Sequence, residues 1–159
     1  MTGVAWHEPA NPKALACEIA ALASESEDRS RRQSMPGPTG ESNELALFQR
    51  APLLCAGPGE MTAQAQKRCV EDLGGRAVVT RGNLSAQDLK TLPAMGGVLW
   101  WGDEAEGRAY AQALSCRSGP IVQLITELPS MAHVMTERHL CIDTTAAGGN
   151  ASLLLSAGQ

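Results

Sequence analysis

The sequence predicts an α/β fold: a Rossmann-like, mostly parallel sheet with flanking helices, plus an N-terminal helix and linker and an extended C-terminal tail. Two observations lead to this prediction. Short apolar runs alternate along the chain with longer segments of helical periodicity, and parallel strands require such helical connections. The chain also has 159 residues, which is enough for one domain with a buried core.

The first expected element is a helix within residues 1–34. Apolar side chains recur three and four residues apart from Pro12 to about Ala23, which places them on one helical face. Asn11 can cap this helix, and proline suits its first position. A charged linker, acidic and then basic, completes this N-terminal region.

Residues 35–50 are expected to form a connector rich in proline and glycine. Two prolines and two glycines lie between Met35 and Asn43. Proline lacks an amide hydrogen and glycine weakens regular elements, so this run is expected to exclude regular helix and central strand. The connector is therefore expected to be ordered or semi-ordered but irregular.

Residues 51–137 are expected to form the Rossmann-like domain. Helical spacing predicts a helix from Met61 to Leu73, and Ser85 and Asp103 are expected to cap two further helices. Short apolar runs of the kind found in buried parallel strands complete the alternation. The expected strands are 51–56, 76–80, 97–101 and 121–125, with a fifth at 140–144.

The composition limits the classes of partner. The formal net charge is −4, whereas a nucleic-acid interface usually needs a concentrated basic face, so no nucleic-acid partner is expected. The apolar runs are too short for a transmembrane segment. Five scattered cysteines without a Cys-x-x-Cys pair, and the lack of a signal-peptide pattern, indicate a cytoplasmic protein with reduced thiols.

The run Gly57-Pro58-Gly59 lies where a dinucleotide-binding fold carries its phosphate loop, between the first strand and the first helix. Three features count against that function. Pro58 has no amide hydrogen, Thr62 occupies the usual place of the third glycine, and the second strand ends in Thr80-Arg81 without an acidic residue for a ribose. A tight turn without a cofactor is the favoured interpretation, and nucleotide binding by Gly57 and Gly59 is the alternative.

No combination of residues predicts catalysis or metal binding. Cys69 follows two basic residues, but helical spacing puts it on the core face, where it would serve in packing. His7, His133 and His139 lack metal-ligand spacing. His139 and Asp143 share one side of an extended segment, which is more typical of a structural hydrogen bond or a surface pair than of an acid-base dyad.

Trp100 and Trp101 are adjacent in an expected strand, so their rings should point to opposite faces of the sheet. Both belong to the core if helices cover both faces. One of them is an interface residue otherwise, since exposed tryptophan often anchors partners. The core position is the favoured interpretation.

Two segments carry a resemblance to a known family. The first runs from Met35 to Asn43 and the second from Arg138 to Leu154. In this order they closely resemble the C-terminal region of proline utilization A, a family of long bacterial bifunctional enzymes. The linker motif consists of Pro36, Gly37, Pro38, Thr39, Gly40, Glu41 and Asn43. The docking motif, within a tail at 138–159, consists of Asp143, Thr144, Thr145, Ala146, Ala147, Gly148, Gly149, Asn150, Ala151, Ser152 and Leu153.

The resemblance implies that this chain is not an enzyme on its own. The family joins an FAD-dependent proline dehydrogenase to an NAD-dependent glutamate-semialdehyde dehydrogenase, and the catalytic residues and both cofactors would lie outside this chain. The corresponding region looks like a non-catalytic aldehyde-dehydrogenase-like domain that covers the channelling tunnel and aids assembly. The implied partners are the catalytic aldehyde dehydrogenase domain, of the same protein or of a partner protomer, and further copies in a homo-oligomer. Peripheral attachment to the membrane is a further option for the full-length enzyme.

The docking motif suits a segment that threads a crevice. Gly148 and Gly149 allow close backbone approach, and Asn150 and Ser152 can bond to backbone groups along the way. The alternative is a flexible terminus rich in small residues. For the whole chain, the rival hypotheses are a small stand-alone nucleotide-binding protein and a free-standing oligomerisation domain.

Overall fold

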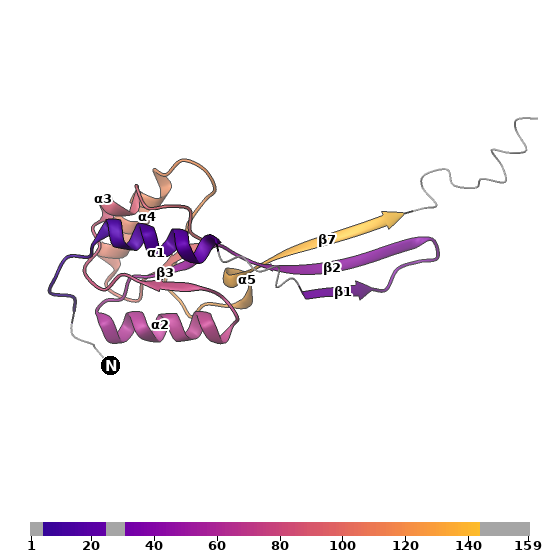
Figure 1. Ribbon diagram of the computed structural model, residues 1–159, viewed down its shortest axis with the longest axis horizontal. Coiled ribbons are helices and arrows are strands. Elements are labelled where there is room, and N and C mark those ends of the chain that lie inside the picture. Colours follow the sequence, from indigo (N-terminus) through magenta and orange to yellow (C-terminus); the bar gives the residue numbers. More distant parts are fainter. Residues whose placement is uncertain (1–4, 25–30, 144–159) are drawn as a thin grey trace, which may run out of the picture. The chain divides into compact units, whose positions relative to one another are not determined.

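A computed structural model describes residues 5–24 and 31–143 of the chain (Figure 1). The described residues form two compact units. The first comprises 5–24 and Gln49–Thr136, and the second comprises 31–48 and 137–143. None of the helices in these described ranges is long and apolar enough to cross a membrane.

The first unit contains a parallel sheet of four short strands. Their order is β4-β3-β5-β6, so the chain moves to one side of β3 and then to the other. In register, Leu53 pairs with Ala77 and with Gly97, and Gly97 pairs with Gln123. The predicted α/β fold with a parallel sheet is confirmed. The strands are β3 Leu53–Cys55, β4 Ala77–Val79, β5 Gly97–Leu99 and β6 Gln123–Ile125.

Helices cover both faces of this sheet, and the three strands β3, β4 and β5 carry no polar side chain. Every residue of β3, β4 and β5 is buried, as expected for parallel strands between two helical layers. Leu54, Val78 and Val98 face a core formed with α1, α3 and α4, whereas their strand neighbours face α2 and α5. The helices are α1 Pro12–Ser24, α2 Glu60–Asp72, α3 Ala86–Leu89, α4 Glu104–Ser115 and α5 Met131–Val134.

The helix caps follow the sequence. The Asn11 side chain accepts hydrogen bonds from the amides of Lys13 and Ala14, both at 3.1 Å. Ser85 accepts from the Asp88 amide at the start of α3, and Asp103 accepts from the Glu106 amide at 2.9 Å at the start of α4. All three predicted caps are confirmed, because each depends only on neighbouring residues.

Arginine side chains close two loops of the first unit. Arg117, just beyond α4, donates to the carbonyls of Leu89, Leu92 and Pro93 in the segment that ends α3. Arg76 donates to the carbonyl of Leu22 near the end of α1 and to a second carbonyl in the loop before β3. These guanidinium groups give the carbonyls charge-assisted hydrogen bonds.

The second unit is a three-stranded sheet in the order β1-β2-β7. Strands β1 and β2 are antiparallel, with Arg31 opposite Leu47 and Met35 opposite Asn43. Pro36–Gly40 therefore form the turn of a hairpin. The strands are β1 Arg31–Met35, β2 Glu41–Gln49 and β7 Met135–Asp143.

Two expectations about this part of the chain were wrong. Glu41, Ser42 and Asn43 were expected in an irregular connector, but they begin β2, which is the central strand of its sheet. The prolines and glycines are confined to the turn, where the Glu41 amide donates to the Pro38 carbonyl at 3.0 Å. The run at 140–144 was expected as a fifth strand of the parallel sheet, but residues up to Asp143 belong to β7, beside β2.

Candidate functional site

The candidate site is the sheet of the second unit, because it contains the linker motif and the beginning of the docking motif. Pro36, Gly37, Pro38, Thr39 and Gly40 form the hairpin turn between β1 and β2. Gly40 has a φ of 89°, a backbone conformation that favours glycine. A Cβ at Gly37 would lie 2.5 Å from the Asn43 side-chain nitrogen, so a larger residue there would displace the Asn43 side chain.

Glu41 joins the two motif regions. Its Oε1 accepts a hydrogen bond from Asn43 Nδ2 at 2.9 Å and another from Cys141 Sγ at 3.0 Å. Glu41 and Asn43 belong to the linker motif, and Cys141 lies two residues before the docking motif begins. The two segments that resemble proline utilization A, 100 residues apart in the chain at this contact, therefore meet in one sheet.

The contacts of Glu41 shift two pKa values in opposite directions. The hydrogen bonds from Cys141 and then Asn43 lower the pKa of Glu41, although the charge of Asp143 opposes this effect. The same bond to Glu41 raises the pKa of the Cys141 thiol. The bond to Glu41 therefore favours the protonated, hydrogen-bond-donating form of the Cys141 thiol over the thiolate.

The other face of this sheet carries apolar side chains. The Arg138 guanidinium lies over the Phe48 ring, 4.6 Å from its centre. Leu140 and Ile142 follow Arg138 at two-residue spacing, so they lie on the same face of β7, and they are 54% and 50% exposed. The pairings of Phe48 with Arg138 and of Glu41 with Cys141 run in opposite order, which indicates that β2 and β7 are antiparallel.

The docking motif is described only at its first residue. Asp143 is the last residue of β7 and lies close enough to Glu41 to influence its pKa. His139 also influences Glu41, so the surroundings of this carboxylate include both members of the pair considered in the sequence. The remaining residues of the motif, Thr144 to Leu153, lie outside the described part of the chain.

The Gly57-Pro58-Gly59 turn is bonded within the first unit. The Gly57 amide donates to Gln66 Oε1 at 3.1 Å, and Gln66 Nε2 donates to the Gly57 carbonyl at 3.0 Å. Trp6 Nε1 donates to the Ala56 carbonyl at 3.1 Å, and a Cβ at Gly57 would lie 2.9 Å from that nitrogen. The amide that a phosphate would need is therefore engaged by a side chain of α2, and Pro58 has none.

Sequence reasoning missed Gln66, although a signal was present. Gln66 is completely buried on the face of α2 that also buries Ala63 and Val70. A polar residue at such a core position normally has a hydrogen-bond partner, and the neighbouring glycine turn offers one. Helical spacing with Ala63 and Val70 could have marked Gln66 as that partner.

The remaining candidate residues serve mainly in packing. Trp100 belongs to the core beside α4, and the half-buried Trp101 packs on the opposite face of the sheet, as the sequence predicted. Cys55 is buried, which raises the pKa of its thiol to about 12, and Cys69 is half-buried. Within residues 5–24 and 31–143, no group of three His, Cys, Asp or Glu side chains could hold a metal ion.

Fold and site together define an α/β domain with a helix-covered parallel sheet and a second, antiparallel sheet. No family model matches the chain. The bifunctional protein PutA of Escherichia coli strain K12 is 30% identical over 143 residues, which cover 76% of this chain and 11% of that protein. The PutA of Salmonella typhimurium is 29% identical over the same length and with the same coverage. The chain is thus homologous to a small part of the PutA proteins, and the resemblance carried by its two motifs is confirmed.

Solved structures also match parts of the chain. A substituted form of proline utilization A (PutA) from Bradyrhizobium japonicum matches with a TM-score of 0.42 and 23% identity, over 71% of this chain and 15% of that chain. Another bifunctional PutA structure matches with a TM-score of 0.39 at the same identity and coverage. The chain spans about 11% of the length of the curated relatives that it matches.

Proposed function

We propose that this chain is a non-catalytic C-terminal module of a bifunctional enzyme that converts proline to glutamate, and that it covers the substrate-channelling tunnel and aids assembly. The contact of Glu41 with Cys141 carries this proposal, since it joins the linker motif to the strand that leads into the docking motif. β7 then presents the docking motif, from Asp143 onward, to the catalytic domain. FAD and NAD bind elsewhere in the full-length enzyme, which is cytoplasmic and homo-oligomeric.

Two further observations support the module in this role. Leu140 and Ile142 give β7 an exposed apolar surface next to the motif, as expected of a segment that packs against a partner. The bonded Gly57 turn disfavours the alternative, a stand-alone nucleotide-binding protein. Titration of the chain with NAD, NADP and ATP, followed by tryptophan fluorescence, tests that alternative directly.

The test of the lid function uses the full-length enzyme. The double substitution Leu140→Ser with Ile142→Ser should introduce a lag before NADH forms from proline, because the intermediate escapes from the tunnel, while each half-reaction keeps its rate. Leu128→Ser is the matched control, since Leu128 is 71% exposed but lies in the first unit. Gly149→Val, within the docking motif, should act like the double substitution.

The outcomes separate a lid from a merely structural segment. The tunnel function would be refuted if NADH formed from proline without a lag in both Leu140→Ser/Ile142→Ser and Gly149→Val. Equal loss of both half-reactions and of the coupled reaction would indicate a general folding defect and would also count against it.

A further inference from the structure

A groove lies along β6, at one edge of the parallel sheet of the first unit. It consists of two adjoining cavities of about 350 and 280 Å³, both lined by Ala111 of α4 and by Leu124 of β6. Trp100 lines one end of this β6 groove, and Ile121 lines the other. One wall of the groove is therefore a helix, and the other is the last strand of the sheet.

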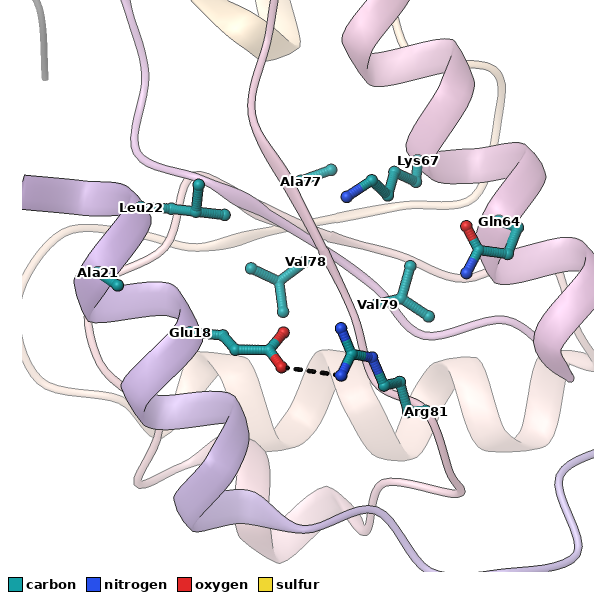
Figure 2. A pocket seen from close by; sticks show the side chains of 9 residues that line it. All are labelled: Glu18, Ala21, Leu22, Gln64, Lys67, Ala77, Val78, Val79 and Arg81. Carbon is teal, nitrogen blue, oxygen red and sulfur yellow. Dashed lines mark ion pairs between the residues drawn. The ribbon is translucent and has the colours of Figure 1, made fainter. Parts of the chain in front are cut away.

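The opposite edge of the sheet, at β4, is closed. Residues 77–79 of β4 are only 2–5% exposed. Figure 2 shows that α1, with Glu18, and α2, with Lys67, lie on the two sides of this strand. Of the two edges of the sheet, β6 is therefore the one that a further strand can reach.

The edge of β6 directs backbone groups outward at accessible positions. The Trp100 amide donates to the Ile125 carbonyl at 2.9 Å, so the backbone groups of Ile125 face β5. Because alternate residues of a strand direct these groups to opposite sides, those of Leu124 and Thr126 face outward. Leu124 is partly exposed and Thr126 is exposed. In the described part of the chain no strand pairs with this side of β6, so its edge is suited to pairing with another strand.

The surroundings of β6 leave room for such a strand. Gln123 is exposed on the face of the sheet opposite α4. Ile121, just before β6, is 98% exposed. On the other face, the wall formed by α4 carries small side chains. Gly107, Ala111 and Ser115 are spaced four residues apart, so they lie along one side of the helix, and all three line the groove.

Pairing of two β6 edges would bring two copies of α4 to packing distance. α4 connects β5 to β6 and packs over this pair of strands, with Tyr110 against Trp100 at 5.1 Å between ring centres. Paired strands lie about 4.8 Å apart, and a helix over two strands lies about half that distance inward from the outer strand. Two such helices would therefore run about 10 Å apart, and packed helices lie about 8–10 Å apart. The small side chains of α4 at the groove suit this contact.

The charges of the groove suit a second copy that runs in the opposite direction. At one end, the carboxylates of Asp103 and Glu104 outnumber the Arg108 guanidinium and give a formal charge of −1. At the other end, Arg117 contributes +1. A copy related by a two-fold axis places the acidic end of each groove beside the basic end of the other. The groove as a whole has no net charge, which gives no preference for a strongly acidic or basic partner.

We propose that two copies of this chain associate through the β6 groove. Their β6 strands pair antiparallel about a two-fold axis beside Leu124 and Ala111, so that the two parallel sheets form one continuous sheet. Leu124 then lies opposite its counterpart, and Thr126 lies opposite Val122 across the axis. The two α4 helices pack across the same axis, and the exposed Ile121 is covered by the segment that follows β6 in the other copy. The proposal concerns the first unit alone and does not depend on the proposed function.

Sedimentation equilibrium of the full chain over a range of concentrations tests the association. The unsubstituted chain should show an equilibrium between monomer and dimer. Ala111→Glu should weaken dimerisation by more than about tenfold, because it sets like charges against each other beside the axis. Ala105→Glu is the matched control, since it makes the same substitution at an exposed position of α4 outside the groove, and it should dimerise normally. A chain that stays monomeric at the concentrations used for NMR, or a dimer that both substitutions affect equally, would overturn the proposal.

A mixture of variants tests the two-fold arrangement. Ala111→Arg alone should also weaken dimerisation, because each arginine would face its own counterpart. An equimolar mixture of Ala111→Glu and Ala111→Arg should dimerise more strongly than either variant alone, since opposite charges then meet at the axis. A mixture that associates no better than its components would show that Ala111 does not lie beside its counterpart, and would refute this arrangement.

Amide hydrogen exchange followed by NMR locates the paired strands. The amides of Leu124 and Thr126 should exchange more slowly in the dimer than in the monomeric Ala111→Glu variant. The amide of Ile125 faces β5 and should be protected equally in both, which also verifies that the variant is folded. A dimer in which Leu124 and Thr126 gain no protection would associate through another surface, and the proposal would then be wrong.

Discussion

Replacement of Gln66 by methionine tests the internal bonding of the glycine turn. Methionine nearly preserves the volume but removes both hydrogen bonds to Gly57. The Gly57 carbonyl keeps the Trp101 amide as a donor at 3.1 Å, so only the Gly57 amide is left without a partner. Two lost bonds, at about 1 kcal/mol each, and one buried unpaired amide, at about 1–3 kcal/mol, predict a loss of roughly 3–5 kcal/mol in the free energy of unfolding.

Urea denaturation followed by circular dichroism measures this loss. Gln64→Met is the matched control on the same helix, since Gln64 is partly exposed and should change stability by less than about 0.5 kcal/mol. If Gln66→Met loses less than about 1 kcal/mol relative to this control, the bonds to Gly57 contribute little and the argument for an internally satisfied turn fails.

Three further predictions concern the thiol, the acid limit and the packing of the chain. Cys141 should react with iodoacetamide at pH 8 more slowly than the exposed Cys17, because the bond to Glu41 raises the pKa of the Cys141 thiol. Glu41→Ala removes this bond and should make Cys141 react faster. Equal rates of Cys141 modification in the unsubstituted protein and in Glu41→Ala would contradict this prediction. Because the pKa of Glu41 in the folded state lies below its ordinary value of about 4.5, Glu41 stabilises the folded state above about pH 4.5. This contribution should be lost as the pH falls from 4.5 through the pKa that Glu41 has in the folded state. Thermal unfolding should therefore depend less on pH in Glu41→Ala over this acidic range. Gly75→Ala should lower the free energy of unfolding, measured by urea denaturation, by about 1–3 kcal/mol, since its Cβ would lie 2.6 Å from Val134 Cγ1. An unchanged free energy of unfolding would show that α5 can move to make room for this Cβ.

The parts of the fold that the sequence predicted depend on local chemistry. Asn11 and Asp103 were identified as caps because a cap bonds to amides two or three residues away. Strands β3, β4 and β5 were identified because strands buried on both faces are continuously apolar. Such signals need no knowledge of distant residues.

The parts that were missed depend on distant residues. Glu41–Gln49 is polar at several positions, and its strand state follows from pairing with β1 and with β7, almost a hundred residues later. The contact of Cys141 with Glu41 joins two motifs that the sequence showed separately, without any sign that they are neighbours. The bond from Trp6 to the Ala56 carbonyl, between residues 50 positions apart, likewise left no sign in the sequence.

The arginine that closes the loop after α3 affects the order in which the chain can complete its fold. Arg117 supplies donors to carbonyls that precede it by 24 to 28 residues. During synthesis, these bonds cannot form until α4 and the residue beyond it have been made. The loop from Leu89 to Pro93 therefore acquires its bonds to Arg117 only after α4 has left the ribosome. Truncation before Arg117 should thus remove the hydrogen bonds that hold the loop between α3 and α4, even though each helix retains its own cap.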